Sequence, residues 1–132
     1  MKPALAAMAL ATAFFAAAAP AQQQPRDEFF WLGEINKASA VINTDEGLLD
    51  KAMAPRVAAG VAQAIKQGNE SGGKRPSTVI TFEPLMIAAA GEDVTLLHAG
   101  RSSQDMHATY RAAILRDDML NLADQLNKTS KT

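Results

Sequence analysis

The chain has no cysteine, few aromatic residues and no excess of one charge. Its 132 residues are 5% aromatic and carry 13 basic against 14 acidic side chains. Without cysteine, a disulfide scaffold, a zinc–thiolate site and a cysteine nucleophile are excluded. With no basic stripe and no aromatic platform, nothing indicates nucleic-acid binding. These absences leave a small domain with an ordinary surface.

A long, strongly apolar run is also missing, although residues 1–21 are alanine-rich. Eleven of these residues are alanine, the only charge is Lys2, and the stretch ends in Ala19-Pro20-Ala21. A basic start, a short apolar run and small residues at its end are typical of a secretory signal peptide, and the run is short for a membrane span. We expect cleavage after Ala21, leaving 111 residues (22–132) that are periplasmic or secreted, with no membrane association.

Helical spacing of apolar residues predicts an all-α fold for the mature chain. Asp27 can cap a helix whose apolar stripe is Trp31, Ile35, Ala38 and Ile42, at spacings of 4, 3 and 4. A second helix is expected to start within residues 48–53, with Pro55 at a boundary or in the first turn. Gly68 is a candidate for the residue just beyond its end, and residues 68–76 read as a loop.

The second half of the chain is predicted to contain two more helices. Residues 78–83 are β-forming in composition, but we favour helix throughout 78–90, started or broken near Pro84. Residues 91–100 form a connection. The strongest pattern runs from Ser103 to Leu126, where Leu115, Met119, Leu122 and Leu126 repeat at 4, 3 and 4. A helix this long, about 36 Å, is expected to need packing partners.

Polar residues crowd the start of that helix, at positions 97–109. Gly100 lets the backbone approach a ligand closely, Ser102 or Ser103 can cap the helix, and Arg101 offers a bidentate grip on a carboxylate. Together with free N–H groups and the helix dipole, this pattern fits an anion site, and His98 could move a proton. The alternative is an ordinary capped helix with solvated Arg and His side chains, and His107 fits a packing or surface position.

The same segment resembles the first signature of the fumarase/aspartase superfamily, most closely its argininosuccinate lyase branch. That branch carries Leu-His-Thr-Gly-Arg-Ser-Arg-Asn-Asp-Gln-Val-Ala-Thr. Eight of the thirteen positions match in order and without gaps: Leu97, His98, Gly100, Arg101, Ser102, Asp105, Ala108 and Thr109. Residues 34–40, 47–49 and 92–94 are more loosely similar to earlier stretches of the branch.

The resemblance implies a lyase that eliminates an amine from an amino-succinyl group and releases fumarate, without a cofactor or a metal. It makes Arg101, Ser102 and Gln104 substrate-binding candidates, with Gln104 standing where the family has Asn. Asp105 and Thr109 are expected to hold the loop and helix in place. His98 is a possible contributor, and its alternative role is to orient the loop through a hydrogen bond. The Gln104 change leaves the exact substrate open.

The resemblance covers about the N-terminal quarter of such an enzyme and therefore implies a truncated chain. The family's later Gly-Ser-Ser-x-Met-Pro loop, with the catalytic serine, is not found here. Family members are homotetramers packed through long central helices, so the last helix would enter such a bundle and the isolated chain would be inactive. Because arginine biosynthesis is cytosolic, export implies a different amino-succinate, or a misread N-terminus. The alternatives are a periplasmic carboxylate-binding helical module and a helical interaction protein, neither of them catalytic.

Overall fold

The structure, a computed structural model, describes residues 24–131, and its regular elements are all helical. They are α1 (Glu28–Asp45), α2 (Ala54–Asn69), α3 (Val79–Ala90), the 3₁₀ helix η1 (Glu92–His98) and α4 (Ser103–Thr129). No strand occurs within the described residues, so the all-α prediction is confirmed, including helix from Val79 onward. The expected signal peptide and its cleavage at Ala21 lie outside the described residues.

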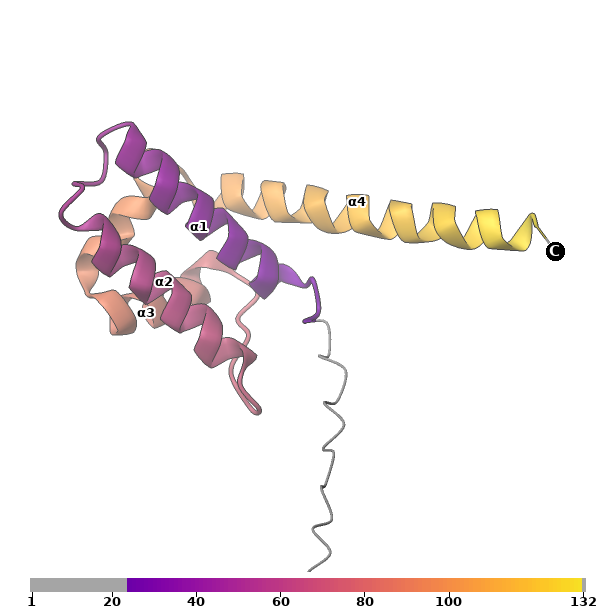
Figure 1. Ribbon diagram of the computed structural model, residues 1–132, viewed down its shortest axis with the longest axis horizontal. Helices are drawn as coiled ribbons and strands as arrows, with labels where there is room; N and C mark the ends of the chain where they lie inside the picture. Colours follow the sequence, from indigo (N-terminus) through magenta and orange to yellow (C-terminus); the bar gives the residue numbers. More distant parts are fainter. Residues whose placement is uncertain (1–23, 132) are drawn as a thin grey trace, which may run out of the picture.

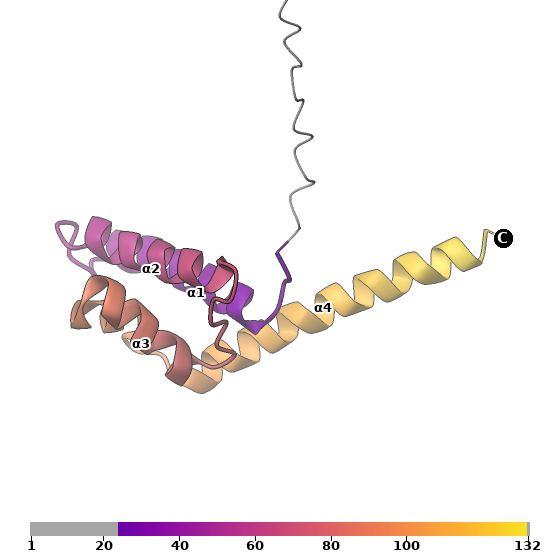
Figure 2. The same ribbon diagram turned by 90° about the horizontal axis from the view of Figure 1, so that it is seen from below.

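The helices divide into a packed body and one projecting helix. α1, α2 and α3 lie against one another, and α4 leaves this body and runs outward for most of its length (Figures 1 and 2). The body has a continuous apolar core in which the Phe29 and Phe82 rings lie 5.3 Å apart, centroid to centroid. The largest fully buried side chains are Phe29, Phe82, Leu32, Leu49, Met86 and Leu97.

Helix α1 starts as predicted but buries a different face. The Asp27 carboxylate accepts the Phe30 backbone N–H at 3.0 Å, which makes Asp27 the N-cap. The predicted stripe of Trp31, Ile35, Ala38 and Ile42 was wrong as the core face, because Ala38 and Ile42 are exposed and the other two only half-buried. The buried face contains Phe29, Leu32, Asn36, Ser39, Ala40 and Asn43. Because three residues on that face are polar, the spacing of apolar residues does not reveal it.

Helix α2 begins later and ends later than predicted. Residues 48–53 form turns, and the helix starts at Ala54 with Pro55 in its first turn, where its missing N–H costs nothing. Gly68 was wrongly placed beyond the end, since α2 runs to Asn69. A Cβ at Gly68 would lie 2.2 Å from Cζ of Phe29. Gly68 therefore serves close packing between α1 and α2 rather than helix termination.

Helix α3 tolerates an internal proline. Thr78 caps it, accepting the Thr81 N–H at 3.4 Å, and Gly91 ends it with a φ of 84°. Pro84 lies inside the helix, so the expected start or break at this residue is wrong. It is the sixth residue, where the loss of one backbone hydrogen bond falls close to the helix start. Residues 92–98, expected as a connection, form η1.

The segment before α1 is tied to the loop before α3 through Arg75. Its guanidinium donates to both carboxylate oxygens of Asp27, at 2.9 and 2.6 Å, and also to the side chain of Asn69. It lies 4.6 Å from the ring centroid of Phe29. Burial alone would raise the pKa of Asp27, but hydrogen bonds from Arg75 and from the Phe30 N–H, with the charge of Arg75, lower it overall.

Helix α4 is packed only near its start. Met106 and Tyr110 are buried, and the Tyr110 hydroxyl donates to the Ser77 carbonyl at 3.1 Å. From Leu115 onward every side chain is exposed except Asp117, which is paired with Arg26 at 3.2 Å. The predicted apolar repeat of Leu115, Met119, Leu122 and Leu126 therefore lies on the surface.

Candidate functional site

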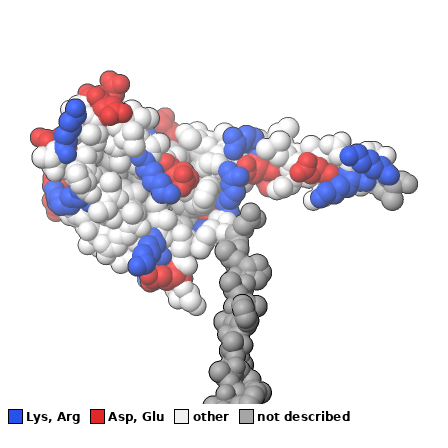
Figure 3. Space-filling view, viewed as in Figure 1, with Lys and Arg blue, Asp and Glu red and all other residues white. Residues whose placement is uncertain are grey.

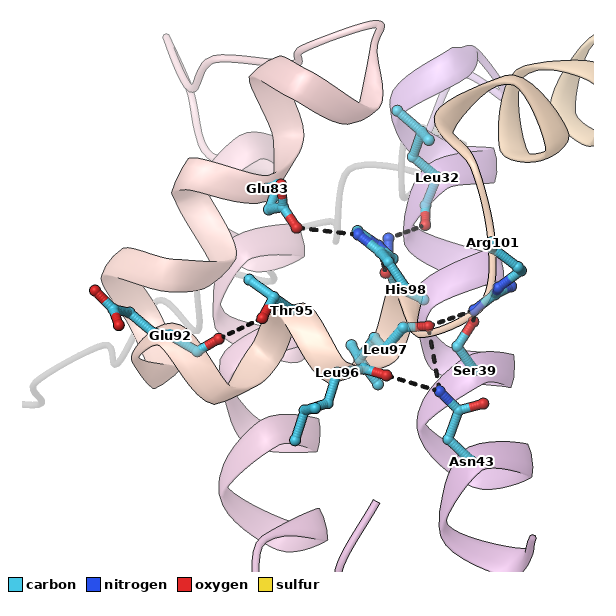
Figure 4. Close-up of polar contacts among 11 residues, drawn as sticks. Leu32, Ser39, Asn43, Glu83, Glu92, Thr95, Leu96, Leu97, His98 and Arg101 are labelled. Carbon is cyan, nitrogen blue, oxygen red and sulfur yellow. Dashed lines mark hydrogen bonds and ion pairs between the residues drawn. The ribbon is translucent and has the colours of Figure 1, made fainter. Parts of the chain in front are cut away.

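The site develops where α1 holds the segment that leads from η1 into α4. The Asn43 amide donates to the carbonyls of Leu96 and Leu97 at 3.1 and 3.2 Å. The Ser39 hydroxyl donates to the Ile35 carbonyl at 2.6 Å and also accepts from Arg101. Ser39 and Asn43, buried on α1, thus hold this loop through hydrogen bonds (Figure 4), which explains their burial.

Arg101 lies at the edge of this loop with part of its guanidinium in use. Its Nη2 donates to the Leu97 carbonyl at 2.5 Å and to the Ser39 hydroxyl, whereas the residue as a whole is exposed. Within the described residues, its Nε and Nη1 have no hydrogen-bond partner. Gly100, with a φ of 74°, makes the turn that precedes it. The result is an anchored cation on an exposed residue, with two nitrogens that make no hydrogen bond to the described residues.

The three other polar side chains that match the signature, Ser102, Asp105 and Thr109, lie at the start of α4. Ser102 is the N-cap, and Asp105 completes a capping box by accepting the Ser102 backbone N–H at 2.9 Å. The Thr109 hydroxyl donates to the Asp105 carbonyl at 2.8 Å. Ser102 accepts the Asp105 N–H at 3.4 Å, so its own hydroxyl proton stays available to an anion. Gln104 is exposed beside it.

His98 faces away from this surface, into the body. Its side chain is only 13% exposed, and both ring nitrogens are occupied. Nδ1 lies 3.1 Å from the Glu83 carboxylate on α3, as Figure 4 shows, and Nε2 lies 2.9 Å from Oδ1 of Asn36 on α1. Arg101, Ser102 and Gln104 lie near one another at the start of α4 because they are close in sequence, and His98 lies apart from them between α1 and α3.

An open groove of about 440 Å³ adjoins Arg101 between α1 and the start of α4. Its polar lining includes Ser39, Arg101, Asp105 and Thr109. Its apolar lining includes Ile35, Ala38 and Ile42, so three members of the predicted stripe form a wall of the groove rather than part of the core. A larger hollow of about 540 Å³ lies between α1 and α2, but it contains none of the signature residues.

The donors at the start of α4 are chemically suited to an anion. The anchored guanidinium, the Ser102 hydroxyl and the first-turn N–H groups of α4 are donors suited to a carboxylate. The Asp105 carboxylate takes one backbone N–H and adds a negative charge nearby, which restricts the anion to the Arg101 side. No side chain on the groove is a free histidine or an activated nucleophile.

Sequence reasoning missed four residues that hold the site together: Asn36, Ser39, Asn43 and Glu83. A signal was present for the first three. Their positions differ by 3 and 4, so they lie on one helical face, and a run of small polar residues at helical spacing suggests a face that receives backbone groups. Glu83 gave no such signal, because only the fold brings it to His98.

The charges on the face of the molecule seen in Figure 3 alternate in sign over the body and over α4. Within residues 24–131, no group of three His, Asp or Glu side chains could hold a metal ion. No helix in that range is long and apolar enough to cross a membrane.

Comparison of the chain with protein families, curated proteins and solved structures finds no match.

Proposed function

We propose that this chain supplies the first substrate-binding loop of an exported lyase of the argininosuccinate lyase type. The proposal rests on the match of eight signature positions in thirteen and on the setting of that signature. The exposed and anchored guanidinium of Arg101 is the observation that carries it, because a carboxylate ligand needs such a group. The reaction would remove an amine from an amino-succinyl substrate and release fumarate.

Each signature side chain has a role in this scheme that its position allows. One free nitrogen of Arg101, Nε or Nη1, donates to a substrate carboxylate, and the Ser102 hydroxyl donates a second hydrogen bond. Gln104 is exposed on the first turn of α4, and in this scheme it determines which substrates fit, because it is one methylene longer than the family's Asn. Asp105 and Thr109 keep the first turn of α4 in shape through the capping box and the Thr109 hydrogen bond.

The chemical steps of the lyase need groups that this chain does not place on the groove. A general base must remove the proton beside the carboxylate, and the resulting anion must be stabilised. In the lyase branch that the signature resembles, other segments supply those groups, including a Gly-Ser-Ser-x-Met-Pro loop. We therefore expect the isolated chain to release no fumarate from argininosuccinate, as followed by ultraviolet absorbance. Turnover by the pure chain would contradict the proposal that this chain binds substrate but does not supply the catalytic groups.

Binding of the product tests the site without catalysis. Fumarate titrated calorimetrically into residues 22–132 should bind, and Arg101→Gln should weaken binding at least about tenfold, the loss of one charged contact. Arg111→Gln removes the same charge from an exposed position of α4 and should leave binding unchanged. Ser39→Ala removes an anchor but keeps the guanidinium, and should weaken binding less than Arg101→Gln. Equal binding by all four proteins would rule the site out.

A carboxylate-binding module without catalysis is the second candidate. It is favoured by one observation, that Arg101 lines the groove whereas no histidine among the described residues does. The two functions differ in what Gln104 does. Gln104→Asn should restore affinity for argininosuccinate if the chain belongs to a lyase, and should change nothing if a simple carboxylate is the ligand.

Export after Ala21 is part of the proposal and has its own test. Mass spectrometry of the protein recovered from a periplasmic or secreted fraction should give Gln22 as the first residue. Met1 retained on protein from the cytosolic fraction would remove the export claim and would permit a cytosolic argininosuccinate-type substrate.

A further inference from the structure

The Glu83–His98–Asn36 contact places a histidine between two hydrogen-bond acceptors. Asn36 is completely buried, and its amide nitrogen donates to the Leu32 carbonyl at 2.8 Å. This bond fixes the orientation of the amide, so it is Oδ1 that faces Nε2 of His98 at 2.9 Å. An amide oxygen only accepts, and Nε2 must therefore carry a proton.

The other ring nitrogen then requires a second proton. A neutral histidine protonated at Nε2 presents a lone pair at Nδ1. That lone pair would face a Glu83 carboxylate oxygen at 3.1 Å, two acceptors in contact. The contact becomes favourable when one proton lies between Nδ1 and the carboxylate, which makes the pair an imidazolium and a carboxylate.

The other histidine of the chain is arranged in the opposite way. Nε2 of His107 lies 3.4 Å from the Val79 backbone N–H, a donor at the start of α3. A proton on that nitrogen would oppose both this donor and the positive end of the helix dipole. The same chain thus holds one histidine that needs two protons and one that is hindered from having them.

We propose that Glu83 is a positioning residue that holds His98 as an imidazolium. The Glu83–His98–Asn36 contact, called the clasp below, then fixes the loop that carries Arg101 in a pH-dependent way. His98 ends η1 and is three residues from Arg101, and the clasp joins that point to both α1 and α3. When the shared proton leaves, the His98–Glu83 contact becomes repulsive and the end of η1 is released. The side-chain hydrogen bonds from Asn43 and with Ser39 then still join the loop to α1.

The charged groups around His98 indicate that its protonation depends mainly on one neighbouring side chain. From α3 the facing group is Glu83, and from α1 it is the neutral Asn36. Helix α2 meets η1 through Arg56, which is paired with Asp93 and bonded to the Ala90 carbonyl at 2.8 Å, at the opposite end of η1. Arg101 on the same loop is turned to Leu97 and Ser39. Glu83 is therefore the one ionised side chain bonded to the His98 ring among the described residues.

Nitrogen-15 NMR of the two histidine rings tests the clasp directly. As the pH rises, His98 should keep the shifts of a doubly protonated ring at pH values where His107 is already neutral. In Glu83→Gln, the amide can donate to Nδ1, so His98 should become neutral at Nδ1 while remaining in place. Glu92→Gln, which removes an exposed charge from η1, should leave His98 unchanged. A wild-type His98 that loses its proton together with or before His107 would overturn the proposal, without need of any variant.

The effect on the Arg101 loop rests on the proposed function and needs a second measurement. Fumarate affinity of the wild-type chain should fall at least about tenfold across the pH range in which His98 loses its proton. The Glu83→Gln chain should show a flat affinity over the same range. If the NMR result holds but no fumarate binds at any pH, the proposed function fails and the clasp stands. If fumarate binds and both chains depend on pH alike, Glu83 does not position the loop.

Discussion

The first and second halves of α4 are parts of one helix with opposite surroundings. In the first half, Met106 and Tyr110 are buried against the body, and a capping box fixes the first turn. In the second half, Leu115, Met119, Leu122 and Leu126 are between 57% and 63% exposed. The chain's own core thus accounts for the direction in which α4 starts, and leaves its distal apolar side chains without packing.

The difference shows where the stability of this fold comes from. A helix of about 15 residues is marginal in water without packing, so the distal half depends on the turns formed before it. Its apolar side chains contribute little to the free energy of unfolding while they stay in contact with water. We infer that their spacing serves contact with another helix, in agreement with the proposed central bundle.

The largest expected effect separates two methionines in these two environments. Met86 on α3 is completely buried, and Met119 on α4 is 63% exposed. Met86→Ala should lower the free energy of unfolding by about 2–5 kcal/mol, because it leaves a cavity in the core. Met119→Ala should change it by less than about 0.5 kcal/mol. Urea unfolding followed by circular dichroism measures both, and equal losses would mean that the distal half of α4 is packed in the folded chain.

A smaller loss is expected where α1 and α2 touch. Gly68→Ala would place a Cβ 2.2 Å from the buried Phe29 ring, which cannot move aside because it also packs on Phe82. We expect a net cost of about 1–2 kcal/mol, overpacking less the helix propensity that alanine adds. Gln63→Ala, exposed on α2, is the control for an alanine in this helix without a clash and should change stability by less than about 0.5 kcal/mol. The cost should shrink when Phe29→Leu is added, and an undiminished cost would argue against a clash with the ring.

A third effect, smaller still, depends on pH. The folded pKa of Asp27 lies below its unfolded value, because the hydrogen bonds from Arg75 and the Phe30 N–H outweigh burial. Its contribution to stability is therefore complete above about pH 4 and is lost as the pH falls through the folded pKa. Asp27→Asn should lower stability at neutral pH and flatten the acid part of the melting-temperature curve. Asp124→Asn, on the exposed half of α4, should reproduce the wild-type curve; a sloping Asp27→Asn curve would contradict the assignment.

Helix ends were predictable to the extent that they depend on local chemistry. Asp27 and Ser102 cap as their residue types imply, because a cap needs only its own neighbours along the chain. Gly68 was misplaced because its purpose is a contact with Phe29, which is 39 positions away. The buried face of α1 was misread for the same reason, because one partner of the buried Asn36 is His98, which is distant in sequence.

The same difference between local and long-range contacts applies to the candidate site. The signature indicated Arg101, Ser102 and Gln104 because they follow one another in sequence, and the fold keeps them adjacent at the end of α4. The partners that hold Arg101 and His98 are 62 residues away on α1, at Ser39 and Asn36, and no local pattern joins positions so distant. The sequence therefore indicates the exposed residues of the site, but not the buried residues of α1 that hold them in place.

The smallest effect on folding is expected from the apolar band of α4, and it is also the most informative about the assembled protein. Met119→Gln with Leu122→Gln should leave the unfolding free energy of the monomer within about 0.5 kcal/mol of wild type, because both side chains are already in water. The same pair should abolish self-association, since positions 115, 119, 122 and 126 have the spacing of a helix–helix seam. Sedimentation velocity should show wild-type chains associating as concentration rises, with the double variant monomeric throughout. Asn121→Gln with Gln125→Asn changes polar positions of the same turns and should associate like wild type. If the wild type stays monomeric at every concentration, the band does not bind a second copy, and the tetramer proposed by resemblance loses its support in this chain.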